Sequence, residues 1–349
     1  MASRVLHVAT AGDDPYSMPI AVAVRSLLEN LDAQYRVELS VLSDRISPSS
    51  QRRCELSWRG FPVSVRWIEP NREDLSGVPV ESLLPVSSYF RLLIPRLVPD
   101  AERILYLDPD TLVRRSVHPL YEVEMGTSVI AAAQDTSCPR IHFRSSLPHY
   151  KIASRYLLNQ DPVPNYQQLQ IPADAPYFNA GVLVMDLEKW RNESLSEHLI
   201  NFTRANFEFN VSADQYSLNA FLWNRWCHVD ARWNQLQSIF GFPSWEESIF
   251  DQASYINLIE DPWIMHFAGR GKPWLPNCQH PFVDEFLSVL DRTDWAGYRP
   301  VDTTITSSRR IRNSWRWLRD SIRVRVRRWT YRLSETQPRS NSWRAQLHA

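Results

Sequence analysis

Two aspartates separated by one residue follow a short apolar run near the first third of the chain. The apolar run 104–107 leads directly into Asp108-Pro109-Asp110. Carboxylates at alternate positions beyond the end of a strand can share one hard divalent cation, and that cation can hold a diphosphate. Aspartate and proline are also common in ordinary turns. Residue type and spacing therefore indicate either a cation site or a plain turn, and the rest of the sequence has to separate the two.

The elements that would position these aspartates alternate between strands and helices. Short apolar runs predict strands at 5–9, 36–42, 63–68, 104–107, 129–133 and 181–185. Helices are predicted at 18–31, 88–97, 195–207, 214–223 and 281–290, and Ser47-Pro48 opens a further helix. The region 240–262 has no clear hydrophobic period. This alternation predicts an α/β fold with a mainly parallel sheet. Ligands of such sheets bind beyond the carboxyl ends of strands, where Asp13 and Asp108 both lie.

The composition is that of a folded protein. Hydrophobic residues make up 44% and charged residues 22% of the 349, which is sufficient for a large core and excludes a disordered chain. The four cysteines are far apart without metal-finger spacing, which favours a reducing compartment. The N-terminal apolar run is too short for a signal peptide, and no apolar run approaches the roughly 20 residues of a membrane span. We therefore expect a cytoplasmic protein.

Basic charge gathers at the C-terminus. From Arg309 onward, twelve arginines face only Asp320 and Glu335, so the tail carries +10 and the remainder −10. Apolar residues recur there at steps of three and four, at Ile311, Trp315, Leu318, Ile322, Val326, Trp329 and Leu333. This stripe predicts a basic amphipathic helix at 309–334 that lies on an anionic membrane surface, or alternatively docks on the acidic body. A nucleic-acid partner is not expected, because the apolar stripe would serve no purpose there.

The same features divide the chain into four parts. A body at 1–294 is followed by a Thr/Ser-containing linker at 295–308, the amphipathic tail at 309–334, and a segment at 335–349 that is expected to be disordered.

Six short motifs, met in order, resemble retaining glycosyltransferase family eight, which includes glycogenins and bacterial lipopolysaccharide α-galactosyl- and α-glucosyltransferases. The matched segments are AGDDPY at 11–16, SYFRL at 88–92, YLDPD at 106–110, YFNAGV at 177–182, DQ at 214–215, and HFAG through KPW at 266–274. The resemblance spans the body and implies a GT-A type, Rossmann-like nucleotide-sugar transferase domain.

The resemblance also implies a role for each motif. Asp108, Asp110 and His266 match the family's ligands of Mn²⁺ (or Mg²⁺), and two carboxylates with one imidazole suit a borderline cation. Lys272 matches a lysine that neutralises charge on the diphosphate. Asp13 matches a uracil contact and Tyr16 an aromatic that stacks on the base, although Pro15 stands where the family often has Asn. The full set expected to contact the UDP-sugar, besides Lys272, is Ala11, Asp13, Tyr16, Arg91, Asp135, Asn179, Asp214 and Gly269.

Gln215 matches the residue beneath the anomeric carbon in this family. An amide oxygen carries no full charge, so Gln215 would be a poor nucleophile. Retention can then come from front-face attack, in which the departing diphosphate takes the acceptor proton. Double displacement through Gln215 or Asp214 stays open. The residues expected to carry the chemistry are therefore Gln215, Asp214 and Lys272.

The sequence thus predicts a metal-dependent retaining hexosyltransferase that uses UDP-glucose or UDP-galactose and a glycan, lipid-linked or small-molecule acceptor. It would act in the cytoplasm, including as a peripheral protein on the inner face of the plasma membrane. One alternative is a transferase with a different nucleotide-sugar. Another is a catalytically weak sugar-nucleotide-binding or membrane-surface protein, which would have no need for all of Asp108, Asp110, His266 and Lys272.

Overall fold

The structure is a computed structural model. It describes residues 4–80, 85–147, 151, 157, 159, 161–269, 271–276 and 278–301. The predicted amphipathic tail at 309–334, the segment at 335–349 and the end of the predicted linker, from residue 302, lie outside the described residues.

A seven-stranded sheet forms the centre of the molecule, in the order β3-β2-β1-β4-β7-β6-β8. Neighbouring strands are parallel except at β7, which runs antiparallel to both β4 and β6. The strands are β1 Arg4–Asp13, β2 Tyr35–Asp44, β3 Val63–Ile68, β4 Arg103–Leu107, β6 Ile130–Gln134, β7 Phe178–Asp186 and β8 Trp226–Val229. The predicted α/β fold with a mainly parallel sheet is confirmed.

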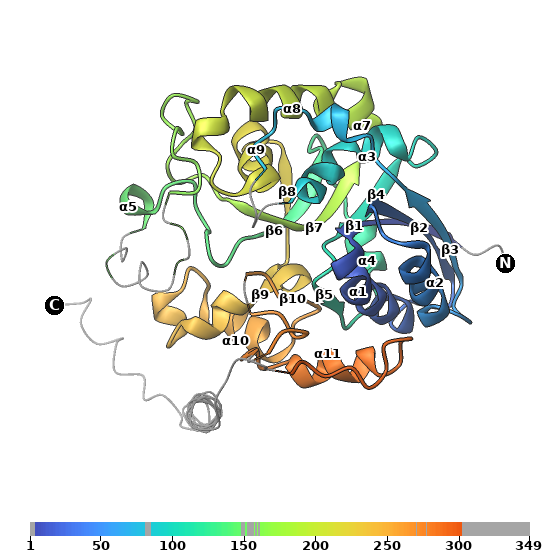
Figure 1. Ribbon diagram of the computed structural model, residues 1–349. Helices are drawn as coiled ribbons and strands as arrows, with labels where there is room; N and C mark the ends of the chain where they lie inside the picture. The colour runs from blue at the N-terminus through green and yellow to red at the C-terminus, as the bar shows by residue number, and fades with distance from the viewer. Residues whose placement is uncertain are drawn as a thin grey trace, which may run out of the picture.

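Helices cover both faces of this sheet (Figure 1). One face packs against α7 Leu187–Asn192, α8 Leu195–Ala205 and α9 Ala213–Phe221, and the other against α1 Ser17–Glu29 and α2 Pro48–Ser57. Strand β4 shows why its sequence is apolar from Ile104 to Leu107: Ile104 and Tyr106 enter the first core, while Leu105 and Leu107 enter the second. A strand buried on both faces has no polar side, which explains the continuous apolar run.

A small second sheet lies at the edge where β4 ends. It consists of β5 Thr111–Val113, β10 Ile264–His266 and β9 Gln235–Leu236, in the order β5-β10-β9. Strand β10 is antiparallel to β5 and parallel to β9. This sheet joins the turn at 108–110 to a segment more than 150 residues further along the chain.

The remaining helices are short. They are α3 Ile94–Leu97, α4 His118–Tyr121, α5 Phe143–Ser146, α10 Gln252–Glu260 and α11 Val283–Leu290. Seven 3-10 helices are also present among the described residues: η1 Asp14–Tyr16, η2 Arg72–Leu75, η3 Val86–Leu93, η4 Phe207–Phe209, η5 Ala231–Asn234, η6 Gln237–Gly241 and η7 Trp245–Glu247.

Most predicted elements are found where they were expected. Ser47 caps α2 as predicted, because its hydroxyl accepts the backbone N–H of Ser50 at 3.3 Å. The helix predicted at 88–97 is confirmed, as the 3-10 helix η3 over most of that segment followed by the α-helix α3. Pro95 has no N–H to donate to the carbonyl of Arg91, so a continuous α-helix would lose a hydrogen bond there. The region 240–262, which showed no period, contains α10 with Asp251 as its N-cap.

The last described residues contact the body. Tyr298 donates its hydroxyl to the Trp274 carbonyl at 3.0 Å, and Arg299 forms an ion pair with Asp291 at 2.6 Å. Among the described residues, no helix has the length and apolarity needed to cross a bilayer.

Candidate active site

The turn Asp108-Pro109-Asp110 connects the large sheet to the small one. Asp108 follows the last residue of β4, and its backbone N–H donates to the Gly181 carbonyl of β7 at 2.7 Å. The Thr111 hydroxyl donates to the Asp108 carbonyl at 2.8 Å, which closes the turn. Asp110 leads into β5, and its carbonyl accepts the Phe267 N–H at 2.9 Å. Backbone hydrogen bonds to distant segments therefore hold both aspartates in place.

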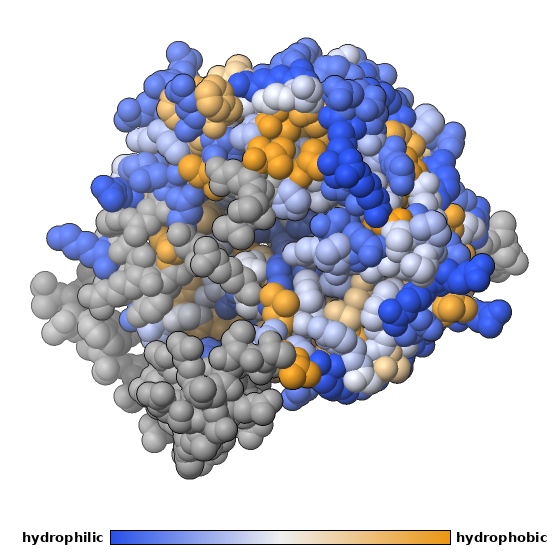
Figure 2. Space-filling model, viewed as in Figure 1, coloured by the Kyte–Doolittle hydropathy of each residue, from blue (hydrophilic) through white to orange (hydrophobic). Residues whose placement is uncertain are grey.

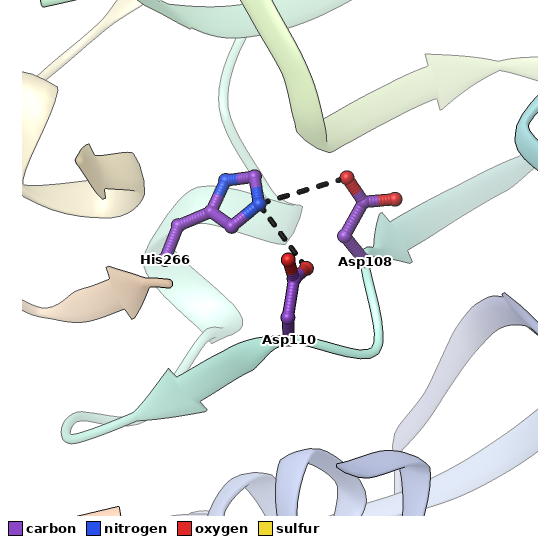
Figure 3. A group of neighbouring side chains, drawn as sticks. All are labelled: Asp108, Asp110 and His266. Carbon is purple, nitrogen blue, oxygen red and sulfur yellow. Dashed lines mark ion pairs between the residues drawn. The ribbon is translucent and has the colours of Figure 1, made fainter. Parts of the chain in front are cut away.

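His266 is brought to this turn by the pairing of β10 with β5, in which it lies opposite Thr111. Its Nε2 is 3.2 Å from a carboxylate oxygen of Asp110 and 3.7 Å from one of Asp108. Figure 3 shows the three side chains pointing toward one another, Asp108 and Asp110 from the turn between β4 and β5 and His266 from β10. One candidate ligand atom from each lies within 4.8 Å of the other two. The sequence-predicted ligands Asp108, Asp110 and His266 therefore meet in space.

The space around this triad fits a cation. Gly181 lies beside it, and a β-carbon there would be 2.2 Å from Cε1 of His266 and 2.8 Å from Oδ2 of Asp108. Burial raises the pKa of Asp110, but the Lys272 ammonium and the hydrogen-bonding contact with His266 outweigh burial and hold that pKa below its ordinary value. Two anionic oxygens and one imidazole nitrogen form a donor set that suits Mn²⁺.

Lys272 lies at the same end of the site. Its ammonium forms an ion pair with Asp110 and donates to the Phe267 carbonyl at 2.8 Å. Burial lowers the pKa of Lys272, but the charge of Asp110 outweighs it and raises that pKa above its ordinary value. The Lys272 side chain is therefore a fixed positive charge directed toward Asp108, Asp110 and His266.

Arg91 connects the triad to the helix α9. Its Nη2 donates to Asp108 at 2.9 Å, while its Nε is 2.9 Å from a carboxylate oxygen of Asp214. Another of its N–H groups donates to the Ala180 carbonyl, and its guanidinium lies 4.4 Å from the centre of the Tyr106 ring. Burial opposes the charge of Arg91, but the carboxylates of Asp108 and Asp214 keep its pKa above the ordinary value. This fully engaged guanidinium fixes both carboxylates.

Asp214 stands at the start of α9 and is 3% exposed. Burial raises its pKa to about 7, although the charge of Arg91 opposes that effect. The residue before it, Ala213, adopts a left-handed backbone conformation with φ of 50°, which is unusual outside glycine. The strained residue thus immediately precedes the two side chains, Asp214 and Gln215, that α9 presents to the site.

Gln215 is held through both ends of its amide. Its oxygen accepts the Ala180 N–H at 3.0 Å, and its nitrogen donates to Asp135 at 3.2 Å. Asn179 also donates to that oxygen of Asp135, at 2.9 Å. The other oxygen of Asp135 accepts three hydrogen bonds from Ser137 and Cys138. Asp135 therefore supports Asn179 and Gln215 from behind.

The expected nucleotide contacts lie where β1 ends. A carboxylate oxygen of Asp13 accepts the Tyr16 N–H at 3.3 Å, and burial raises the pKa of Asp13. The Tyr16 ring stands edge-on to the ring of Trp274, with 5.8 Å between the ring centres. The segment at 13–16 and the segment around Lys272 are thus adjacent.

One cleft of about 320 Å³ joins these parts. Figure 2 shows a hollow near the middle of the face where β7, β5 and β10 lie in Figure 1. Twelve of the predicted site residues line the cleft: Ala11, Asp13, Tyr16, Arg91, Asp108, Asp110, Asn179, Asp214, Gln215, His266, Gly269 and Lys272. Asp135, expected to contact the donor sugar, is 2% exposed and does not line the cleft.

Two residues at this site had no assigned role in the sequence. Gly181 was part of a matched motif, and its lack of a side chain is what admits His266. Asn234 is 0% exposed and hydrogen-bonds to both His266 and Asn179. Asn234 belongs to no motif, and a single polar residue beside Trp233 gives no signal by which sequence reasoning could find it.

Comparison with known proteins shows a family and a fold that this chain shares. The family model described as glycosyl transferase family 8 matches residues 7–278. General stress protein A of Bacillus subtilis (strain 168) is 27% identical over 296 residues, covering 84% of this chain and 95% of that protein. A lipopolysaccharide 1,2-glucosyltransferase of Escherichia coli K12 is 21% identical over 304 residues, covering 86% of this chain and 82% of that protein. The structure of the galactosyltransferase LgtC with donor and acceptor sugar analogs has a TM-score of 0.68 at 23% identity, covering 87% of this chain and 99% of that one.

Proposed function

The chain belongs to glycosyl transferase family 8, and we propose that it moves a glucosyl or galactosyl group from a UDP-sugar to a glycan or lipid-linked acceptor, with retention and with the help of a divalent cation. The observation that carries the proposal is the convergence of Asp108, Asp110 and His266 with Lys272 at one end of a single cleft. A protein that merely bound sugar nucleotides would not need four buried or half-buried charged groups in one place.

Asp108, Asp110 and His266 would hold the cation, Mn²⁺ or Mg²⁺. When bound, the cation would neutralise charge on the diphosphate and so make it a better leaving group. Lys272 would add a second positive charge to the same oxygens, because its ammonium already lies against Asp110. Asp13 and Tyr16, which lie where β1 ends, would hold the base. Arg91 would keep Asp108 in place for the cation and Asp214 in place for the sugar.

Asn179, Asp214 and Gln215 would contact the sugar, with Asp135 supporting two of them. The Gln215 amide is tied at both ends, and the Asp214 carboxylate faces Arg91. These contacts restrain both side chains, which supports front-face transfer. In that reaction the bond from C1 to the diphosphate oxygen breaks, the acceptor oxygen bonds to C1 on the same face, and the acceptor proton passes to the departing diphosphate. A glycosyl adduct trapped on Gln215 or Asp214 would instead establish double displacement.

The acceptor is proposed from two features. Relatives of this chain include a lipopolysaccharide 1,2-glucosyltransferase and a lipopolysaccharide 1,3-galactosyltransferase, so a lipid-linked glycan is a reasonable acceptor class. The basic amphipathic helix predicted at 309–334 would hold the enzyme at the inner face of the plasma membrane through its arginines and its apolar stripe. A protein shortened to end near Thr304 should then keep activity on a soluble acceptor and lose binding to anionic vesicles. Full-length protein that ignores such vesicles at low salt would contradict this assignment of the tail.

The main test is a panel of nucleotide sugars incubated with the protein and Mn²⁺ in the absence of acceptor. Slow release of UDP from UDP-glucose or UDP-galactose, stopped by a chelator, is the expected result. Turnover only of a sugar on another nucleotide would refute the UDP assignment. Binding without release, even with an added glycan acceptor, would favour a binding protein.

A further inference from the structure

A buried asparagine outside the recognised motifs contacts the back of His266. Asn234 ends η5 and directly precedes β9, whose Leu236 lies opposite His266 in the small sheet. Its side-chain oxygen is 2.9 Å from Nδ1 of His266, and its side-chain nitrogen is 2.9 Å from the side-chain oxygen of Asn179. The segment is fixed to β10 by the Trp263 N–H, which donates to the Arg232 carbonyl at 2.9 Å.

The direction of each hydrogen bond can be deduced from the far end of this network. The Asn179 side-chain oxygen accepts the Gly181 backbone N–H at 2.9 Å, and a backbone N–H can only donate. The Asn179 nitrogen faces a carboxylate oxygen of Asp135 at 2.9 Å. That carboxylate already accepts backbone N–H groups through its other oxygen, so it accepts here as well. The orientation of the Asn179 amide is thereby determined.

That orientation determines the next two groups. Asn234 must donate its N–H to the Asn179 oxygen, so its own oxygen faces His266. A carbonyl oxygen only accepts, and Nδ1 of His266 must therefore carry a hydrogen. The lone pair of the neutral imidazole is left on Nε2, which faces Asp108 and Asp110. Without Asn234, the Asp110 oxygen at 3.2 Å would instead favour a hydrogen on Nε2.

We propose that Asn234 is a positioning residue that holds His266 with its Nδ1–H turned inward and its Nε2 lone pair turned to the cation site. The same amide joins this site to the sugar end, because hydrogen bonds continue from Asn179 through Asp135 to Gln215. Histidine ligands need such a partner on the second ring nitrogen to fix their tautomer and ring angle. The proposal rests on the proposed function only in that the site binds a cation.

The tautomer is measured first, on the unaltered metal-free protein. Long-range ¹H–¹⁵N spectra of histidine-labelled protein at about pH 9, above the ordinary histidine range, report which ring nitrogen carries the hydrogen. The His266 signals are identified by their loss in a His266→Gln protein. We expect hydrogen on Nδ1. A His266 ring with hydrogen on Nε2 would overturn the proposal, whether or not the protein proves to be a glycosyltransferase.

The second measurement is the affinity for Mn²⁺ in the absence of any sugar nucleotide. Mn²⁺ is titrated into the protein, and the electron paramagnetic resonance signal reports the free Mn²⁺. Asn234→Leu removes the acceptor while keeping Asp108, Asp110 and His266. We expect affinity to fall about 10- to 100-fold. Asn165→Leu is the matched control, since Asn165 is also buried and hydrogen-bonded, to Asn206 and Tyr216, away from the cleft. Folded Asn234→Leu that binds Mn²⁺ as tightly as this control would refute the role of Asn234.

A third variant separates the two contacts of the amide. Asn234→Asp keeps an oxygen for the Nδ1–H but places a second oxygen against the oxygen of Asn179. Mn²⁺ affinity should be retained or increased, while the KM for the donor should rise about tenfold because Asn179 is displaced. Weaker Mn²⁺ binding in Asn234→Asp than in Asn234→Leu would contradict the assigned direction of the hydrogen bonds. If the unaltered protein binds no Mn²⁺ yet shows the Nδ1–H ring, the positioning role stands and the cation proposal fails.

Discussion

Gly181 and His266 are in such close contact that only a glycine fits between the turn at 108–110 and the imidazole. A β-carbon on Gly181 would lie 2.2 Å from Cε1 of His266 and 2.7 Å from its Nδ1. Both contacts are far inside van der Waals distance, and the imidazole is held from behind by Asn234. The ring therefore has to move if any side chain is added at position 181.

Replacing Gly181 by Ala should disable the cation site. The added methyl group would displace His266 or Asp108, so Mn²⁺ affinity and transfer should each fall by at least about 100-fold. Gly241→Ala is the control, because nothing lies within 4 Å of a β-carbon there and its φ is not positive. Equal Mn²⁺ affinities of the two variants, measured by titration with the metal alone, would contradict this account of the glycine.

Asp110→Asn should abolish transfer while the protein stays folded. The carboxylate of Asp110 meets both His266 and Lys272, so its loss would remove a proposed cation ligand and leave the ammonium without its partner. Circular dichroism reports the fold, and release of UDP from the donor reports the chemistry. A chelator should have the same effect on the unaltered protein as the substitution. Near-normal turnover in chelator would refute the metal assignment for Asp108 as well.

Lys272→Ala should lower kcat by more than it weakens UDP binding. Negative charge grows on the diphosphate as the bond to the sugar breaks, so a nearby ammonium stabilises the transition state more than the bound substrate. We expect a loss of kcat of about 100-fold, in line with the removal of one charge-stabilising group. Calorimetric UDP affinity and steady-state kinetics, taken together, separate the two effects. A change in affinity alone would make Lys272 a binding residue.

Ala213→Val should impair both stability and activity, whereas Ala213→Gly should retain activity. Ala213 has a φ of 50°, and a β-branched side chain resists that conformation at a cost of about 1–3 kcal/mol. Relaxation of the backbone at 213 would move Asp214 and Gln215, which follow it directly. Ala205→Val serves as the comparison, because Ala205 is exposed on the regular helix α8. Denaturant midpoints and kcat/KM of the three variants test this, and an active, stable Ala213→Val would contradict it.

His280→Asn should reduce the loss of unfolding free energy that occurs as the pH falls. Burial lowers the pKa of His280 to about 3, while an unfolded chain binds the proton near the ordinary value of about 6.5. Between these values the unfolded state holds more protons, so stability falls as pH falls, by up to about 1.4 kcal/mol per pH unit. In the unaltered protein the Phe282 N–H donates to Nδ1 of His280 at 3.2 Å. The oxygen of an asparagine side chain at position 280 keeps an acceptor for that N–H.

Denaturant unfolding at about pH 7 and about pH 4.5 measures that slope. The unaltered protein should lose more stability between the two than His280→Asn. His198→Asn removes an exposed histidine from α8 and should leave the slope unchanged. Equal slopes in the unaltered protein and His280→Asn would mean that His280 does not titrate on unfolding.

Local sequence determined the elements and the chemically active motifs of this protein. The apolar run of β4, the cap at Ser47 and the Asp-Pro-Asp turn depend on residues a few positions apart, so their pattern can be read along the chain. Twelve of the thirteen predicted site residues line the cleft, and each of those twelve belongs to a short motif that can be recognised along the chain. The local pattern predicted a helix at 88–97 but not its type, which is 3-10 in η3 and α-helical in α3.

Tertiary structure alone decided how those motifs meet. Because β7 runs antiparallel, the start of that strand, with Asn179 and Gly181, reaches the edge where β4 ends. The pairing of β10 with β5 sets His266 against Asp110, and η5 brings Asn234 behind the imidazole. Asp135 lies behind the cleft wall for a similar reason, since its partners come from β7 and α9. These relationships join segments dozens of residues apart, and no periodicity or spacing within one segment encodes which distant segment packs against it.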